Sequence, residues 1–271
     1  MYRSKSLRLA AVAIAVVMLA TVVSPAFAFA ATLKLSGSTT VQPLAVQWAA
    51  AYHRLHPGTS ITVAGGGSGT GFKDAASGKS DLGMSSREKA STDAASIVMY
   101  PVARDALAII VHKNGLLANT SEATIKKIFT GKITNWRQVS SKFPNKAIVL
   151  VGRTGASGTY TYFKESFLSN SRQSSRTKMY ASNGMVRSAV ARNRYAIGYV
   201  SVAFVNSSVR GVKIGGVAPT KANAISGRYK YRRYLYLLSN GAATGEALAF
   251  INYAKSSAGQ AIAGREYLRL R

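Results

Sequence analysis

The 271-residue chain contains no cysteine and few residues able to hold a metal ion or carry acid–base chemistry. It has three histidines and nine carboxylates, against 36 lysines and arginines. The absence of cysteine excludes disulfides, thiolate metal sites, a cysteine nucleophile and a lipid anchor attached through cysteine. The scarcity of histidine and carboxylate argues against a transition-metal centre. We therefore expect no metal and no cofactor.

The sequence also has no long apolar run after its first 30 residues. Within them, Arg3, Lys5 and Arg8 precede an apolar stretch that Ser24-Pro25 ends, and small residues follow. This order predicts a secretory signal peptide over residues 1–28, with cleavage after residue 28 or 30. The alternative is a membrane anchor, which needs roughly 20 apolar residues. We expect a periplasmic or secreted protein that is not a cysteine-anchored lipoprotein.

Acidic residues are scarce enough to leave a formal net charge of +27. Such a charge attracts anions of any size and does not choose among them. Hydrophobic residues make up 47% of the chain, which supplies ample material for a core, and its length suggests about two domains. A shortage of carboxylates also suits an exported protein in an acidic medium, because fewer native ion pairs are lost on protonation.

Short apolar strands alternate with amphipathic helices along the chain, which predicts an α/β protein with largely parallel sheets. The expected strands lie near residues 33–35, 61–63, 82–85, 106–111, 148–151, 197–200 and 234–238. The expected helices lie near residues 41–52, 72–76, 121–131, 160–167 and 247–254.

Four turns rich in Ser, Thr and Gly are each expected to join a strand to a helix. They are Ser38-Thr39-Thr40, Ser68-Gly69-Thr70, Ser85-Ser86 and Ser157-Gly158-Thr159. The amides of a helix N-terminus lack internal partners and attract anions. Each turn alone is an ordinary helix cap. Together, with Arg153 four residues before Ser157, they predict a cage for a small tetrahedral oxyanion.

The sequence also bears on two other functions, an enzyme and a protein that binds nucleic acid. The sequence lacks paired carboxylates, a metal cluster and a nucleophile–base pair, so we expect no enzymatic activity. The segment from Arg228 to Tyr234 interleaves basic and aromatic residues, as surfaces that bind single-stranded nucleic acid do. It indicates either a secreted protein that binds nucleic acid or another polyanion, or a hinge segment with solvated Lys and Arg, and the hinge is the preferred interpretation.

Taken in order, several segments resemble the substrate-binding proteins of bacterial phosphate ABC transporters, in the periplasmic binding protein superfamily. The matching segments are residues 37–41, 65–71, 81–87, 100–105, 128–136, 153–159, 195–200 and 236–241. They cover nearly all of the chain that follows the predicted signal peptide.

The resemblance implies a two-lobed fold of type II, in which each lobe is a mixed, mainly parallel sheet flanked by helices. Lobe I would comprise residues 31–103 plus 230–271, and lobe II residues 104–229. Hinges would lie near residues 100–104 and 228–234. The implied function is a monomeric, non-enzymatic receptor that captures inorganic phosphate between the lobes and delivers it to a membrane ABC permease, with no specific nucleic acid as partner.

The family's phosphate contacts fall on residues of all four turns and on the arginine. The implied contacts are Thr39, Thr40, Ser68, Arg153, Ser157, Gly158 and Thr159, with Ser38 as their neighbour and Ser86 in the third turn. Some members carry an aspartate at the position of Ser86, which accepts the proton of hydrogen phosphate and repels sulfate. A serine discriminates less, so a receptor for another tetrahedral oxyanion, such as sulfate, is an alternative.

Overall fold

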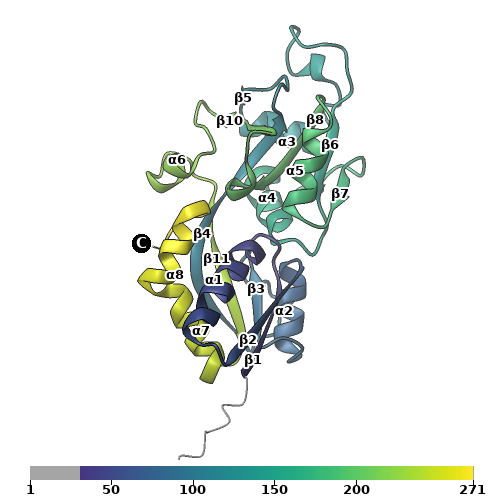
Figure 1. Ribbon diagram of the computed structural model, residues 1–271. Coiled ribbons are helices and arrows are strands. Elements are labelled where there is room, and N and C mark those ends of the chain that lie inside the picture. Colours follow the sequence, from purple (N-terminus) through teal and green to yellow (C-terminus); the bar gives the residue numbers. More distant parts are fainter. Residues whose placement is uncertain (1–30, 271) are drawn as a thin grey trace, which may run out of the picture.

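The computed structural model describes residues 31–270, so the predicted signal peptide lies outside the described residues. These residues form two lobes, one above the other in Figure 1, each with a sheet between helices. Within them, no helix has the length and apolar character needed to span a membrane.

Lobe I, the lower lobe in Figure 1, contains the N-terminal strands and both C-terminal helices. Its strands are β1 (Ala31–Gly37), β2 (Thr59–Gly66) and β3 (Leu82–Ser85). Its helices are α1 (Gln42–Leu55), α2 (Ser68–Ala76), α7 (Gly245–Lys255) and α8 (Ser257–Glu266).

Lobe II, the upper lobe in Figure 1, contains the central part of the chain. Its strands are β5 (Asn119–Thr120), β6 (Val149–Arg153), β7 (Lys178–Tyr180), β8 (Ala196–Ser201), β9 (Val209–Gly211) and β10 (Lys213–Ile214). Its helices are α3 (Glu122–Phe129), α4 (Gly158–Leu168), α5 (Asn183–Ala191) and α6 (Lys221–Ile225), with short 3₁₀ turns at Trp136–Gln138 and Val202–Phe204.

Two strands join the lobes: β4 (Ile97–His112) and β11 (Arg232–Asn240). The lower part of β4 pairs with β11 in antiparallel register, and its continuation over Leu107–Val111 pairs with β8. The strand order is therefore continuous through both lobes, β2-β1-β3-β11-β4-β8-β6-β7, with β9 paired to β4. The pairs β1–β2, β1–β3, β6–β7 and β6–β8 are parallel, and the pairs that involve β4 or β11 are antiparallel.

The core of lobe I forms where one face of α1 meets the sheet and the C-terminal helices. The residues that recur at helical spacing, Leu44, Ala45, Trp48 and Tyr52, are all buried. The Trp48 indole also donates a hydrogen bond of 2.8 Å to the carbonyl of Gly259 at the start of α8. This contact ties the first helix to the last.

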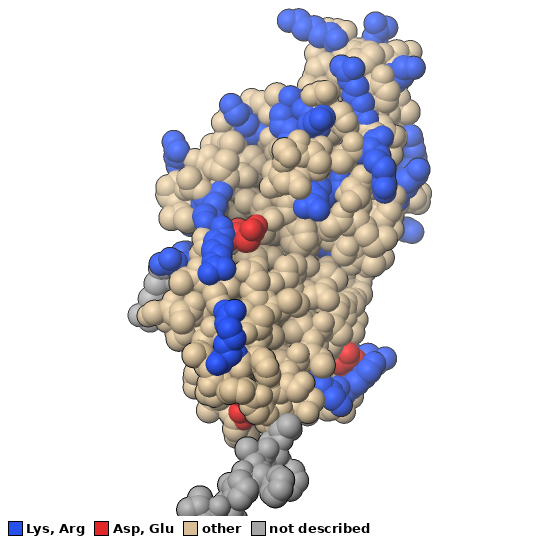
Figure 2. Space-filling view, in the orientation of Figure 1, with Lys and Arg blue, Asp and Glu red and all other residues tan. Residues whose placement is uncertain are grey.

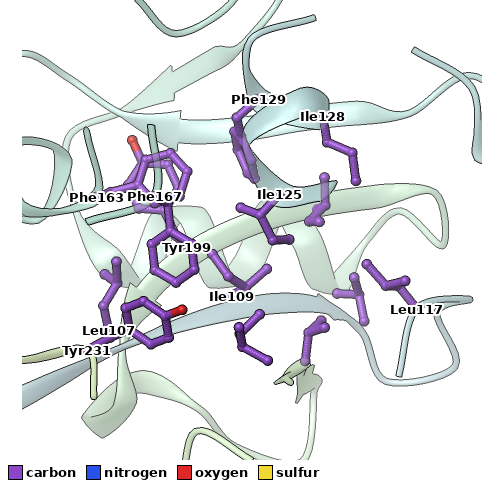
Figure 3. Packing of buried hydrophobic residues seen from close by; sticks show 14 of the residues in the cluster. Leu107, Ile109, Leu117, Ile125, Ile128, Phe129, Phe163, Phe167, Tyr199 and Tyr231 are labelled. Atoms are coloured by element: carbon purple, nitrogen blue, oxygen red, sulfur yellow. The ribbon is translucent and has the colours of Figure 1, made fainter. Parts of the chain in front are cut away.

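The core of lobe II is rich in aromatic side chains, as Figure 3 shows. Phe163 of α4 stacks on Tyr199 of β8 at 3.9 Å between ring centroids, and Phe129 of α3 meets Phe163 edge-on at 4.8 Å. The buried length of β4, including Leu107 and Ile109, lies beneath these rings (Figure 3). This packing holds the middle of α4 against the sheet, and one of the four turns lies at the start of the same helix.

The elements predicted from the sequence are present with one correction. No helix follows Ser85-Ser86: β3 ends at Ser85, and the next regular element is β4. The chain turns into a loop because both Arg87 Nη atoms donate to the Asp93 carboxylate at 2.6 and 2.9 Å, and the Ala90 amide donates to the same carboxylate at 2.6 Å. The third turn therefore offers the side chains of its serines to the predicted oxyanion site, but no helix N-terminus.

Candidate functional site

The three lobe I turns bring their hydroxyl groups into one buried cluster. Ser38 Oγ donates to Ser86 Oγ at 3.0 Å. Ser68 Oγ accepts a 3.0 Å hydrogen bond from the Ser86 amide and lies 3.4 Å from Ser86 Oγ. All three residues are at most 2% exposed. Residues up to 48 positions apart in the sequence are thus in contact.

The fourth turn, in lobe II, meets this cluster across the space between the lobes. Thr159 Oγ1 lies 2.9 Å from Thr40 Oγ1, and Arg153 Nη2 donates to Thr39 Oγ1 at 2.8 Å. The Gly69 amide at the start of α2 donates to the Ala156 carbonyl at 2.9 Å. The four turns therefore converge, as the sequence predicted.

Two glycines permit this close approach. Gly158 faces lobe I so closely that an added Cβ would lie 2.3 Å from Ser68 Oγ and 2.8 Å from Ser86 Oγ. Gly37, at the end of β1, has a φ of +129°, and a Cβ there would lie 2.5 Å from the Met84 carbonyl oxygen. A side chain at either position would push the turns apart, because contacts this short require the neighbours to move.

Arg153, the last residue of β6, is a cation of the cluster and is 1% exposed. Its Nε donates to the Tyr180 carbonyl at 3.3 Å and its Nη2 to the Ala181 carbonyl at 2.9 Å. Its Nη1 is buried without a hydrogen-bond partner among residues 31–270, and no described carboxylate lies within ion-pair distance of the guanidinium. Burial, together with the positive charge of nearby Arg233, lowers the pKa of Arg153 to about 10. The guanidinium is thus a buried cation that an anion would stabilise.

The helix tips supply fewer free amides than the sequence suggested. Ser157 caps α4 by accepting from the amides of Thr159 and Tyr160, at 3.1 and 3.3 Å, and the Gly69 amide is bonded across the lobes. The hydroxyl groups and the Arg153 guanidinium therefore provide more of the site's hydrogen-bonding capacity than the backbone amides that the sequence led us to expect.

Three polar residues of the site were missed from the sequence: Asp105, Asn183 and Arg233. Arg233 of β11 donates through Nη2 to Thr159 Oγ1 at 3.0 Å and through Nη1 to the Ser86 carbonyl at 3.1 Å. It also pairs with Asp105 of β4 at 2.8 Å. Asn183, at the start of α5, donates through Nδ2 to Thr40 Oγ1 at 2.9 Å. The site therefore contains two arginines, where the sequence predicted one.

The burial of Arg233 could have been predicted from the segment that suggested nucleic-acid binding. Residues 229, 231, 233 and 235 are all buried, the alternation of a strand with one face covered. Tyr229 and Tyr231 are 1% and 4% exposed, so their rings are not available to stack on bases. The basic residues that alternate with the buried ones, Lys230 and Arg232, lie on the exposed face. These two tyrosines therefore belong to the core, and Arg233, on the same buried face of the strand, is not a solvated charge.

The other Lys and Arg side chains of residues 31–270 are all at least partly exposed. Lys and Arg side chains are spread over both lobes in Figure 2, and Asp and Glu are few on the same face. By contrast, Arg153 and Arg233 are 1% and 7% exposed, so the candidate site is separate from this solvated charge. Hydroxyl groups from both lobes around a buried guanidinium suit a small tetrahedral oxyanion, because donors from several directions can replace its water.

Comparison with known proteins gives consistent results. The family described as a PBP superfamily domain matches residues 24–258. The phosphate-binding protein PstS of Bacillus subtilis is 33% identical over 228 residues, which cover 83% of this chain and 75% of that protein.

Two solved structures share the fold. One is an X-ray structure, with bound phosphate, of a Clostridium perfringens protein assigned as a phosphate ABC transporter substrate-binding protein. It is 33% identical with a TM-score of 0.82, covering 88% of this chain and 98% of that one. The other, an ABC-type phosphate transport receptor from Vibrio cholerae, is 26% identical with a TM-score of 0.73, covering 88% of this chain and all of that one.

Proposed function

Because the chain belongs to the phosphate-binding proteins of ABC transporters, within the periplasmic binding protein superfamily, we propose that it captures inorganic phosphate between its two lobes and delivers it to a membrane permease. It would act as an extracytoplasmic, monomeric receptor without enzymatic activity. The proposed contacts are Ser38, Thr39, Thr40, Ser68, Ser86, Arg153, Ser157, Gly158 and Thr159.

The observation that carries this proposal is the buried Arg153 guanidinium among hydroxyl groups of both lobes. A buried arginine without a carboxylate is unfavourable unless an anion compensates its charge. Arg153 already contacts Thr39 of the opposite lobe. An oxyanion beside it would be bound by both lobes at once, and Nη1 offers the donors that a phosphate oxygen accepts.

Binding by both lobes couples capture to closure. In an open arrangement, an anion would touch only one set of turns, and in the closed one it would gain the contacts of the other set. This difference in contacts shifts the equilibrium toward the closed form. We assign residues 31–103 and 230–271 to one moving body and residues 104–229 to the other, with hinges in the two segments that join them.

The test is calorimetric titration of the phosphate-free protein with inorganic phosphate at low salt and at about 0.5 M sodium chloride. We expect one phosphate per chain and an affinity that changes little with salt, because a buried ion pair is weakly screened. Binding of several anions per chain, lost at the higher salt, would instead indicate attraction by the surface charge. Titration with sulfate under the same conditions distinguishes a phosphate receptor from a receptor for another oxyanion.

A further inference from the structure

A second arginine touches the candidate site, and it carries its own counter-ion. Arg233 and Asp105 are direct partners in the antiparallel register of β11 and β4, the two strands that join the lobes. Arg233 Nε and Nη2 donate to Asp105 Oδ2 at 3.0 and 2.8 Å. The side chains are 3% and 1% exposed. Ser201 of β8 donates to the other oxygen of the same carboxylate at 2.6 Å.

The rest of the Arg233 guanidinium is bonded to both halves of the site. It donates hydrogen bonds to the Ser86 carbonyl of lobe I and to the Thr159 hydroxyl of lobe II. Thr159 in turn contacts Thr40. A buried ion pair is often replaceable by apolar residues without loss of stability. A pair that contacts groups from both lobes therefore suggests a role beyond stability.

We propose that the Arg233–Asp105 pair sets the charge of the oxyanion site and thereby its preference between singly and doubly charged anions. Among residues 31–270, the charged side chains that hydrogen-bond directly to the hydroxyl groups of the site are Arg153 and Arg233, and Asp105 cancels one of these positive charges. A net single positive charge matches an oxyanion that carries one negative charge, such as dihydrogen phosphate. Asp105 is then a specificity residue that acts through Arg233.

The proposal rests on the function proposed above and makes a directional claim. Below about pH 6, inorganic phosphate is mainly a monoanion, whereas sulfate remains a dianion. Coulomb energy scales with the product of the charges, so removing one nearby negative charge stabilises a bound dianion twice as much as a monoanion. Removing a positive charge has the opposite effect.

The experiment compares the dissociation constants of sulfate and phosphate at about pH 5 in the parent protein and in charge variants. Asp105→Asn should lower the sulfate-to-phosphate ratio of dissociation constants about tenfold, and Arg233→Gln should raise it by a similar factor. The double variant Asp105→Asn/Arg233→Gln restores the net charge, so its ratio should return to within about threefold of the parent value. Glu122→Gln, which removes a carboxylate paired with Lys230 at the surface, is the control and should leave the ratio unchanged.

A ratio that stays within about twofold of the parent value in both single variants would overturn the proposal. A double variant that fails to restore the ratio would overturn it as well, since hydrogen bonds and not charge would then decide selectivity. If Asp105→Asn does not fold, Arg233→Gln alone tests the proposal, because it should raise the sulfate-to-phosphate ratio of dissociation constants. Failure of the parent protein to bind either anion would refute the receptor function itself, whereas phosphate binding with unmoved ratios would refute only this inference.

Discussion

At the scale of single residues, the third turn is where selectivity can be changed most simply. Ser86 is 1% exposed and lies between Ser38 and Ser68, all of which carry hydroxyl groups. A hydroxyl can both donate and accept, so it serves a protonated phosphate oxygen and a bare sulfate oxygen alike. A carboxylate only accepts and would repel an oxygen without a proton.

Ser86→Asp should therefore raise the preference for phosphate over sulfate by about tenfold near pH 7. Ser86→Asn is the matched control, because it has nearly the size of aspartate without the charge and should leave the preference near the parent value. Calorimetric titrations in which phosphate and sulfate compete measure the phosphate-over-sulfate preference of each variant. Equal preferences in the aspartate and asparagine variants would show that side-chain size, and not charge, acts at this position.

Sequence patterns predicted these site residues better than their hydrogen-bond partners. Ser and Thr in glycine-rich turns are recognisable because they end strands, and these turns do converge. Asp105 lies in a largely apolar strand, and its partner Arg233 is 128 positions away. No local periodicity joins two such positions, because their pairing depends on how β4 and β11 lie beside each other.

At the scale of elements, the spacing of apolar residues predicted the helices that have one apolar face and the strands that are short and buried. It failed after β3, where two serines resemble a helix cap but Arg87 and Asp93 close a loop. Burial alone would raise the pKa of Asp93, but hydrogen bonds from Arg87 and Ala90 outweigh it and lower this pKa below the ordinary value. The loop is thus fixed by an ion pair that no apolar pattern reveals.

The start of α4 offers a test of how closely the lobes must approach. Gly158→Ala places a methyl group where Ser68 Oγ would be only 2.3 Å away, so the turns cannot meet as they do. We expect phosphate affinity to fall at least about tenfold, with little change in the unfolding temperature of the phosphate-free protein. The control is Gly155→Ala, three residues earlier in the chain, where a Cβ meets nothing within 4 Å. Equal affinities in the two variants would contradict a site built from both lobes.

At the scale of the whole molecule, the shortage of carboxylates predicts resistance to acid. The Lys230 ammonium lowers the pKa of Glu122, and the pKa of Asp93 is also lowered, so each group stabilises the fold above its unfolded pKa. That contribution is lost as the pH falls through the lowered folded-state value. Burial raises the pKa of Glu165, so this group stabilises the fold at low pH and loses that contribution as the pH rises.

These effects oppose one another, and protonating all nine carboxylates adds only nine charges to a molecule that already carries +27. We expect the free energy of unfolding to fall by no more than about 3 kcal/mol between pH 7 and pH 3. Urea unfolding at a series of pH values measures this difference. A protein that is already unfolded at pH 4 would contradict the acid-resistance interpretation. Adaptation to an acidic medium would then not explain its excess of basic residues.

The central claim is that a phosphate ion neutralises the buried Arg153 guanidinium between the lobes. Phosphate titration of the Arg153→Met and Arg194→Met variants tests it most directly, since each removes one arginine from lobe II and Arg194 is exposed. We expect Arg153→Met to weaken binding by at least about a hundredfold and Arg194→Met by less than about threefold. Similar affinities in the two variants would contradict the claim, because the overall positive charge would then suffice for binding.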